Sequence, residues 1–98
     1  MLIKNYSKSG AICRVTFKYN NSDSSENAVL VGEFNSWSLQ ENPMKKLKNG
    51  GFSVTISLLA GNSFQFRYLL DGKTWVNDAE ADSYVTNQYG EENSVVTV

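Results

Sequence analysis

The chain has 98 residues, of which 41% are hydrophobic and 19% charged, and its net charge at pH 7 is −1. A chain of this length buries one modest core, so we expect a single domain over residues 1–98. The near-zero charge excludes a whole-surface attraction for nucleic acid or for an anionic membrane, and we expect neither as a partner.

Five strands are expected in chain order. Residues 11–19 (AICRVTFKY) alternate apolar and polar side chains, which is the pattern of a half-buried strand, and AVLVGEF at 28–34 is a second strand. The alternation returns in GFSVTISL at 51–58 and SFQFRYLL at 63–70, and the last strand is NSVVTV at 93–98. The inward positions are Cys13, Val15, Phe17 and Tyr19, then Phe52, Val54, Ile56 and Leu58, then Phe64, Phe66, Tyr68 and Leu70.

Turn signals separate these strands. They are NSDSSEN at 21–27, NGG at 49–51, AGN at 60–62 and the hairpin dipeptide DG at 71–72. Short strands with such spacing predict an antiparallel sandwich or a small barrel. The segment 77–93 lacks a strand pattern, so we expect an irregular loop there, where binding residues often lie.

The titratable residues offer little for catalysis. The sequence has no histidine, so neither a Ser–His nor a Cys–His pair is available. A glycosidase needs two carboxyl groups flanking a cleft, for which so small a sandwich has little volume. Asp78, Glu80 and Asp82 have the spacing of the first ligands of a calcium loop, but Ser83 and Tyr89 stand where that loop needs glycine and glutamate. We expect a solvated acidic turn, and no catalytic residue, metal site or cofactor.

Features that mark a cellular compartment are few. Cys13 is the single cysteine, so a disulfide framework is excluded, and we expect it to be a small core residue. The sequence MLIKNYSKSG lacks the apolar stretch of a secretory signal, and no apolar run approaches the length of a membrane span. We therefore expect a cytoplasmic setting.

The two tryptophans lie in or beside turns. Trp37 belongs to GEFNSWS at 32–38, and Trp75 follows the DG turn. Each indole would cover the end of the core, or it would stack on a sugar, because the apolar face of a pyranose suits an indole ring. Planar polar groups suit the hydroxyl rim of a sugar, and Gln65 and Arg67 are predicted to point outward close by. Further groups of this kind belong to the C-terminal loop: Asn77, Asn87, Gln88 and Asn93.

Four motifs in order, VGEFNSWS, FQFRYLLDG, TWVNDAEAD and VTNQYGEENSVV, resemble the family 48 carbohydrate-binding modules. This family includes the glycogen-binding domain of the AMP-activated protein kinase beta subunit and the early-set domains that precede the catalytic barrels of isoamylases and branching enzymes. The likeness covers residues 28–98. It implies an all-β, immunoglobulin-like early-set antiparallel β-sandwich, and an α-1,4-glucan such as glycogen, starch or a cyclodextrin as ligand.

The resemblance also implies roles for individual residues. Trp37 and Trp75 correspond to the two stacking tryptophans of the family. Arg67 occupies the place of a lysine that bonds sugar hydroxyls, and Asn93 matches a hydrogen-bonding asparagine.

Two positions depart from the family pattern but remain candidate contact residues. Tyr89 stands where the kinase module has a leucine, and Glu91 stands where it has a threonine. Tyrosine still supplies an apolar face, and glutamate still accepts hydrogen bonds from hydroxyls.

Three functions follow as hypotheses. The first is non-catalytic binding of α-1,4-glucan. The second is an early-set protein–protein interaction module, associated with a glucan-processing enzyme and without sugar binding of its own. The third is nucleic-acid binding by a barrel with exposed aromatic side chains, against which the acidic residues around Trp75 argue.

Overall fold

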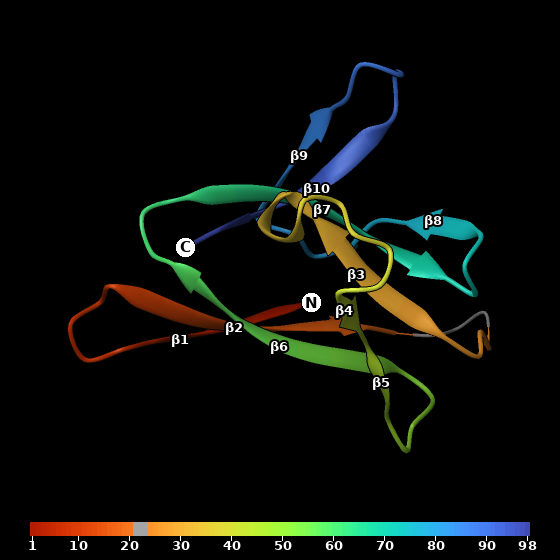
Figure 1. Cartoon of the computed structure of the whole chain (residues 1–98), viewed down its shortest axis with the longest axis horizontal. Coiled ribbons are helices and arrows are strands. Elements are labelled where there is room, and N and C mark those ends of the chain that lie inside the picture. The colour runs from red at the N-terminus through yellow and green to blue at the C-terminus, as the bar shows by residue number, and fades with distance from the viewer. Residues whose placement is uncertain (21–23) are drawn as a thin grey trace.

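The computed structural model describes residues 1–20 and 24–98, so the predicted turn at 21–27 lies partly outside the described residues. The chain forms two antiparallel sheets packed as two layers (Figure 1). The predicted all-β antiparallel sandwich is therefore confirmed.

Sheet 1, the lower layer in Figure 1, has four strands in the order β1-β2-β6-β5. Sheet 2 has six strands. Five follow the order β4-β3-β7-β10-β9, and the sixth, β8, pairs with β7 outside this order. The strands of sheet 1 are β1 (Leu2–Tyr6), β2 (Ile12–Tyr19), β6 (Phe52–Leu59) and β5 (Lys45–Lys46). The strands of sheet 2 are β4 (Asn42–Pro43), β3 (Ala28–Gly32), β7 (Ser63–Leu70), β10 (Glu92–Thr97), β9 (Ser83–Thr86) and β8 (Thr74–Val76).

The strand order is that of an immunoglobulin sandwich. Strands β1, β2, β6 and β5 take the positions A, B, E and D of one sheet, and β3, β7 and β10 take C, F and G of the other. The short β4 extends the second sheet at its C edge, whereas β8 and β9 are additions on the side of β7 and β10. These additions lie beside the strands that carry the candidate site.

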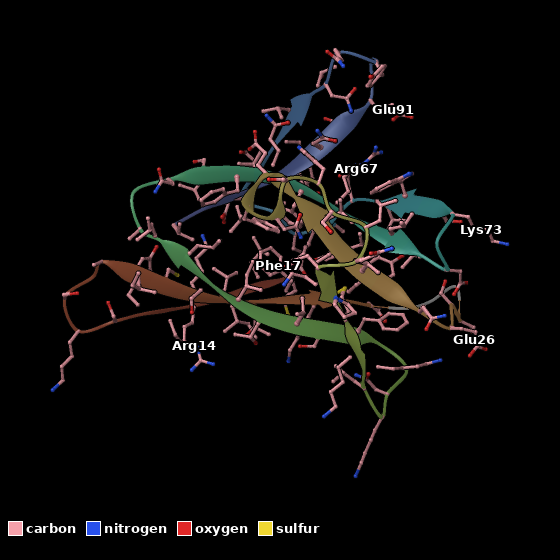
Figure 2. All side chains as sticks on the ribbon, viewed as in Figure 1. Arg14, Phe17, Glu26, Arg67, Lys73 and Glu91 are labelled. Carbon is pink, nitrogen blue, oxygen red and sulfur yellow. The ribbon has the colours of Figure 1, made fainter. Side chains whose placement is uncertain are left out.

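Aromatic side chains join the two layers. Phe17, from β2, meets Phe66, from β7, edge to face with 5.1 Å between ring centroids, and Tyr19 meets Tyr68 at 5.4 Å. Figure 2 shows Phe17 between the sheets. Such tilted and edge-to-face pairs are the preferred aromatic arrangements. The alternation predicted for β2, β6 and β7 is confirmed, since its inward residues, Cys13 included, belong to the core or pack against it.

Several strands were not predicted. Strand β1 precedes the first expected strand, and β8 and β9 lie in segments without a clear alternation, β9 within the expected loop at 77–93. The residues of β9 are all exposed, so burial imposes no pattern on them; pairing with β10 makes this segment a strand.

In the described part of the chain the only helix is η1 (Glu33–Asn35), and no helix there is long and apolar enough to span a membrane.

The acidic segment at 78–82 is not the solvated turn that we expected, because Asp78 is buried. Its carboxylate accepts hydrogen bonds from the Tyr68 hydroxyl at 2.7 Å and from the Glu80 backbone N–H at 2.7 Å. Burial, together with the Asp78 carboxylate, raises the pKa of Tyr68. The Asp78 carboxylate also pairs with the N-terminal ammonium group of Met1, and Asp82 forms an ion pair with Lys4 at 2.7 Å. Within residues 1–20 and 24–98, no cluster of three or more His, Cys, Asp or Glu side chains could hold a metal ion.

Candidate functional site

The outer face of sheet 2 carries a groove of about 730 Å³. Its floor is formed by outward-facing side chains of β7 and β10, and its walls come from the loop after η1, from β8 and from the β9–β10 hairpin. The groove is lined by Trp37, Leu39, Gln65, Arg67, Trp75, Thr86, Asn87, Gln88, Tyr89, Glu91 and Asn93. All six candidate contact residues, the four that the family resemblance implied and the two that depart from its pattern, are brought together here.

Trp37 forms one wall and sits on an unusual backbone. Ser36 and Trp37 are both left-handed, with φ of 56° and 58°. This conformation costs a non-glycine residue about 1–3 kcal/mol, so the surrounding structure has to enforce it. The Trp37 backbone N–H donates to the Gly32 carbonyl at 2.8 Å. The Trp37 side chain is 39% exposed, so it lies over the groove and outside the core.

Asn35 organises this loop. Its Oδ1 accepts hydrogen bonds from the backbone N–H groups of Gly32 and Ser38, at 3.1 and 3.2 Å. Its Nδ2 donates to the Leu30 carbonyl at 3.0 Å and to Asn42 Oδ1 at 2.8 Å. These four bonds use the full capacity of a carboxamide. Asn35 therefore ties β3, β4 and the Trp37 turn into one unit.

Gly32 allows the loop to approach β7 closely. A Cβ at this position would lie 2.7 Å from the Gln65 carbonyl oxygen, 2.8 Å from Phe34 Cζ and 2.9 Å from Phe66 Cβ. Its backbone is extended, so the requirement is one of space and not of φ. A side chain here would push the Trp37 loop away from β7.

Trp75 forms a second wall of the groove. It pairs with Leu69 across the β7–β8 hairpin and therefore faces outward, as Leu69 does. The turn has positive φ at Asp71 and Gly72, 51° and 68°, as the DG hairpin signal requires. Trp75 is 42% exposed, similar to Trp37.

Arg67 lies on the groove floor between Trp75 and Glu91. Its guanidinium carbon is 6.0 Å from the centre of the Trp75 ring, at the limit of a cation–π contact. Its Nη1 donates to Glu91 Oε1 at 3.2 Å. The Nε–H is buried, and no hydrogen-bond partner for it exists among the described residues.

Asn93 lies deeper in the groove than its predicted role in bonding sugar hydroxyls suggests. It is 6% exposed, and its Nδ2 donates to Gln65 Oε1 at 3.0 Å. Its Oδ1 accepts from Asn87 Nδ2 at 3.3 Å. One Nδ2–H remains after these bonds are counted. Asn93 thus joins the floor to the hairpin and keeps one donor for a ligand.

Tyr89 stands at the tip of the β9–β10 hairpin and is 78% exposed. Asn87 holds this tip, because its Oδ1 accepts from the backbone N–H of Tyr89 at 2.9 Å and of Glu91 at 3.1 Å. Gly90 supplies the positive φ of 79° that closes the turn. The most accessible aromatic side chain of the groove is therefore carried on a fixed turn.

Sequence reasoning did not assign site roles to Leu39 or Asn35, and it placed Asn87 only among the planar polar groups of the C-terminal loop. Leu39 is an exposed apolar side chain two residues after Trp37, which is a signal that the sequence does carry. The roles of Asn35 and Asn87 depend on hydrogen bonds to residues up to seven positions away, so only the fold reveals them.

Comparison with known proteins identifies the chain's family. A family model described as the glycogen recognition site of AMP-activated protein kinase matches residues 13–98, which is all but the first twelve residues. A search of curated proteins found no match. The family match covers the core strands and every residue that lines the groove. The chain belongs to this family of glycogen-recognition carbohydrate-binding modules.

Proposed function

We propose that this module binds α-1,4-glucan in the groove of sheet 2 by stacking glucose rings on Trp37 and Trp75. Arg67, Glu91 and Asn93 bond the sugar hydroxyls, and Tyr89 adds an apolar face at the rim. The observation that carries the proposal is the placement of two half-exposed indoles on one groove, with bonding groups between them.

The lining of the groove suits a sugar. Pyranose rings have apolar faces and a hydroxyl rim, so a site for them needs flat apolar walls beside planar donors and acceptors. The tryptophans supply the walls, and Arg67, Asn93 and Gln65 supply the polar groups. The volume of about 730 Å³ lies within the usual range for small-ligand sites.

The expected affinity is modest. Covering one face of an indole removes roughly 75–125 Å² from water, which is about 2–3 kcal/mol per tryptophan as an upper bound. Immobilising both partners offsets much of this gain, so a short oligosaccharide binds in the micromolar-to-millimolar range. A polymer with repeated sites compensates by rebinding along its length.

The groove supports binding and not hydrolysis. Glycoside hydrolysis uses two carboxyl groups on either side of the scissile bond. Among the described residues that line the groove, Glu91 is the one carboxylate, and it is paired with Arg67. Any chemistry on the bound glucan therefore belongs to a separate catalytic unit, such as a glucan-processing enzyme.

Isothermal titration with β-cyclodextrin tests the proposal. Trp37→Ala and Trp75→Ala are each expected to weaken binding by about tenfold or more, because each removes one stacking wall. Tyr6→Ala is a matched control, since Tyr6 is an exposed aromatic residue on β1 of sheet 1. It should leave the affinity unchanged.

Either of two results would contradict the proposal. The first is the absence of heat from the wild type at millimolar ligand. The second is an unchanged dissociation constant in the Trp37 or the Trp75 variant, when thermal unfolding shows that the variant is folded.

A further inference from the structure

The only charged side chains in the described groove lining are Arg67 and Glu91. They form an ion pair with 3.2 Å between Nη1 and Oε1 (Figure 2). Their charges cancel overall, but the two side chains are not equally accessible to a ligand. Arg67 is 16% exposed and lies along the floor, whereas Glu91 is 62% exposed at the rim. An approaching ligand therefore meets the negative member of the pair first.

We propose that Glu91 makes the groove selective for neutral glucan against glucan that carries phosphate esters, and that it holds Arg67 beside Trp75. This inference rests on the proposed glucan binding. Glu91 thus acts through its own charge at the rim and through the position of the guanidinium on the floor.

The hydrogen-bonding chemistry of the pair fits neutral hydroxyls. Arg67 only donates and ionised Glu91 only accepts, whereas each sugar hydroxyl does both. Two neighbouring hydroxyls on one glucose can therefore accept from the guanidinium and donate to the carboxylate. A phosphate monoester carries about −1.5 to −2 charges at neutral pH and offers mainly acceptors. Next to Glu91 it would meet like charge and lose the donor that the carboxylate needs.

The position of Arg67 also depends on Glu91. Among the described residues, the Arg67 side chain makes one hydrogen bond, from Nη1 to Glu91. The buried Nε–H of Arg67 has no partner among them. In Glu91→Gln the guanidinium keeps the contact with the Trp75 ring, and the amide oxygen can still accept a hydrogen bond, but the charge-assisted bond that fixes its orientation is replaced by a weaker neutral one. The guanidinium would then be freer to bond a phosphate. Glu91→Gln is thus expected to lower the discrimination between neutral and phosphorylated glucan in two ways. It removes the negative charge that repels phosphate, and it leaves the guanidinium freer to bond phosphate.

The test compares β-cyclodextrin with β-cyclodextrin phosphorylated on all its primary hydroxyls, by calorimetry at low and at physiological salt. The wild type is expected to bind the neutral ring at least about tenfold more tightly. Glu91→Gln should reduce this ratio several-fold, chiefly by binding the phosphorylated ring better. Glu91→Asp keeps the charge and should retain most of the ratio.

Glu92→Gln is the matched control. Glu92 is the adjacent exposed carboxylate on β10 and is not part of the groove lining, so its loss should leave the ratio unchanged. Equal binding of both rings by the wild type would overturn the selectivity and leave glucan binding intact. A Glu91→Gln variant that binds both rings more weakly by the same factor would overturn it too. Failure of the neutral ring to bind would remove this inference together with the proposed function.

Discussion

The outer faces of the two sheets differ although both belong to one sandwich. On sheet 1 the outward side chains are mostly polar and at least partly exposed: Thr16 and Thr55 share a hydrogen bond at 2.8 Å, and Arg14 points away from the sandwich (Figure 2). On sheet 2 the outward positions include Val31 and Leu69, which are buried outside the main core cluster.

The difference has a simple cause. An antiparallel sheet with one face in water shows clean alternation, whereas a sheet covered on both faces shows continuous apolar runs. Strand β3 has the sequence AVLVG, and Val29 and Val31 face the side opposite to Leu30. Loops and added strands therefore cover part of this outer face, and the groove is the part that they leave open. An unbroken apolar strand in a small sandwich marks the face on which additional structure is built.

The largest expected effect is the loss of stability when a side chain is added to Gly32 on β3 of sheet 2, compared with Gly51 in the turn before β6 of sheet 1. Gly32→Ala should lower the free energy of unfolding by about 3 kcal/mol, because its Cβ would fall below 3.0 Å from three groups. Gly51→Ala, where the nearest atom is the Tyr19 carbonyl oxygen at 3.0 Å, should cost about 1 kcal/mol. Urea unfolding of the two variants measures this; equal costs would mean that the Trp37 loop adjusts freely.

A smaller effect is expected at Asn35. Asn35→Ala removes four hydrogen bonds and should cost about 2 kcal/mol, and it should also weaken β-cyclodextrin binding by releasing the Trp37 turn. Thr55→Ala, which removes the exposed hydroxyl bond of sheet 1, should cost about 0.5 kcal/mol or less and leave binding unchanged. Thermal unfolding and calorimetry report the two quantities. Unchanged binding by a folded Asn35 variant would show that the turn does not depend on this residue.

The smallest effect is a pH dependence. The backbone N–H groups of Asn27 and Glu26, at 2.9 and 2.8 Å, hold the pKa of Asp71 below its ordinary value. A carboxyl whose pKa is lowered by folding stabilises the protein above its unfolded pKa, about 3.9, and this contribution is lost as the pH falls through the folded value. Asp71→Asn keeps the acceptor oxygen but not the charge, so its stability should approach that of the wild type below about pH 4.

The reverse substitution, from an asparagine to an aspartate, can be made at Asn49 in the turn before β6 of sheet 1. Asn49 Oδ1 accepts from the Gly51 N–H at 2.9 Å, so a neutral side chain there does what Asp71 does in sheet 2. Asn49→Asp should introduce a pH dependence of the same sign. Urea unfolding between pH 7 and pH 3 measures both variants; parallel curves for the wild type and Asp71→Asn would show that the Asp71 charge contributes nothing.

Much of the fold could be predicted because burial imposes alternation. Strands β2, β6 and β7 each bury one face, and their sequences show it directly. Strands β8 and β9 could not be predicted in this way, because their side chains are mostly exposed and pairing with β7 and β10 defines them. The burial of Asp78 was missed for a related reason. Its partner Tyr68 is ten residues away and reaches it only in the folded sandwich.

The residues of the candidate site could be predicted from the sequence, but the contacts that hold them in place could not. Its six residues came from an ordered set of motifs, and the structure brings them to one groove. The depth of Asn93, the pairing of Arg67 with Glu91 and the bonding of Asn35 and Asn87 follow from distances that no sequence spacing gives. These details set the charge that a ligand meets and the rigidity of the walls.

The paired left-handed residues Ser36 and Trp37 have a consequence for kinetics. Because the loop backbone at Trp37 is already in place before any ligand arrives, the wall that carries the indole is pre-organised and association requires little loop rearrangement. The modest affinity proposed for this groove implies that a bound glucan exchanges quickly. Under the proposed glucan binding, the module would therefore move among neighbouring sites of a polymer instead of remaining at one.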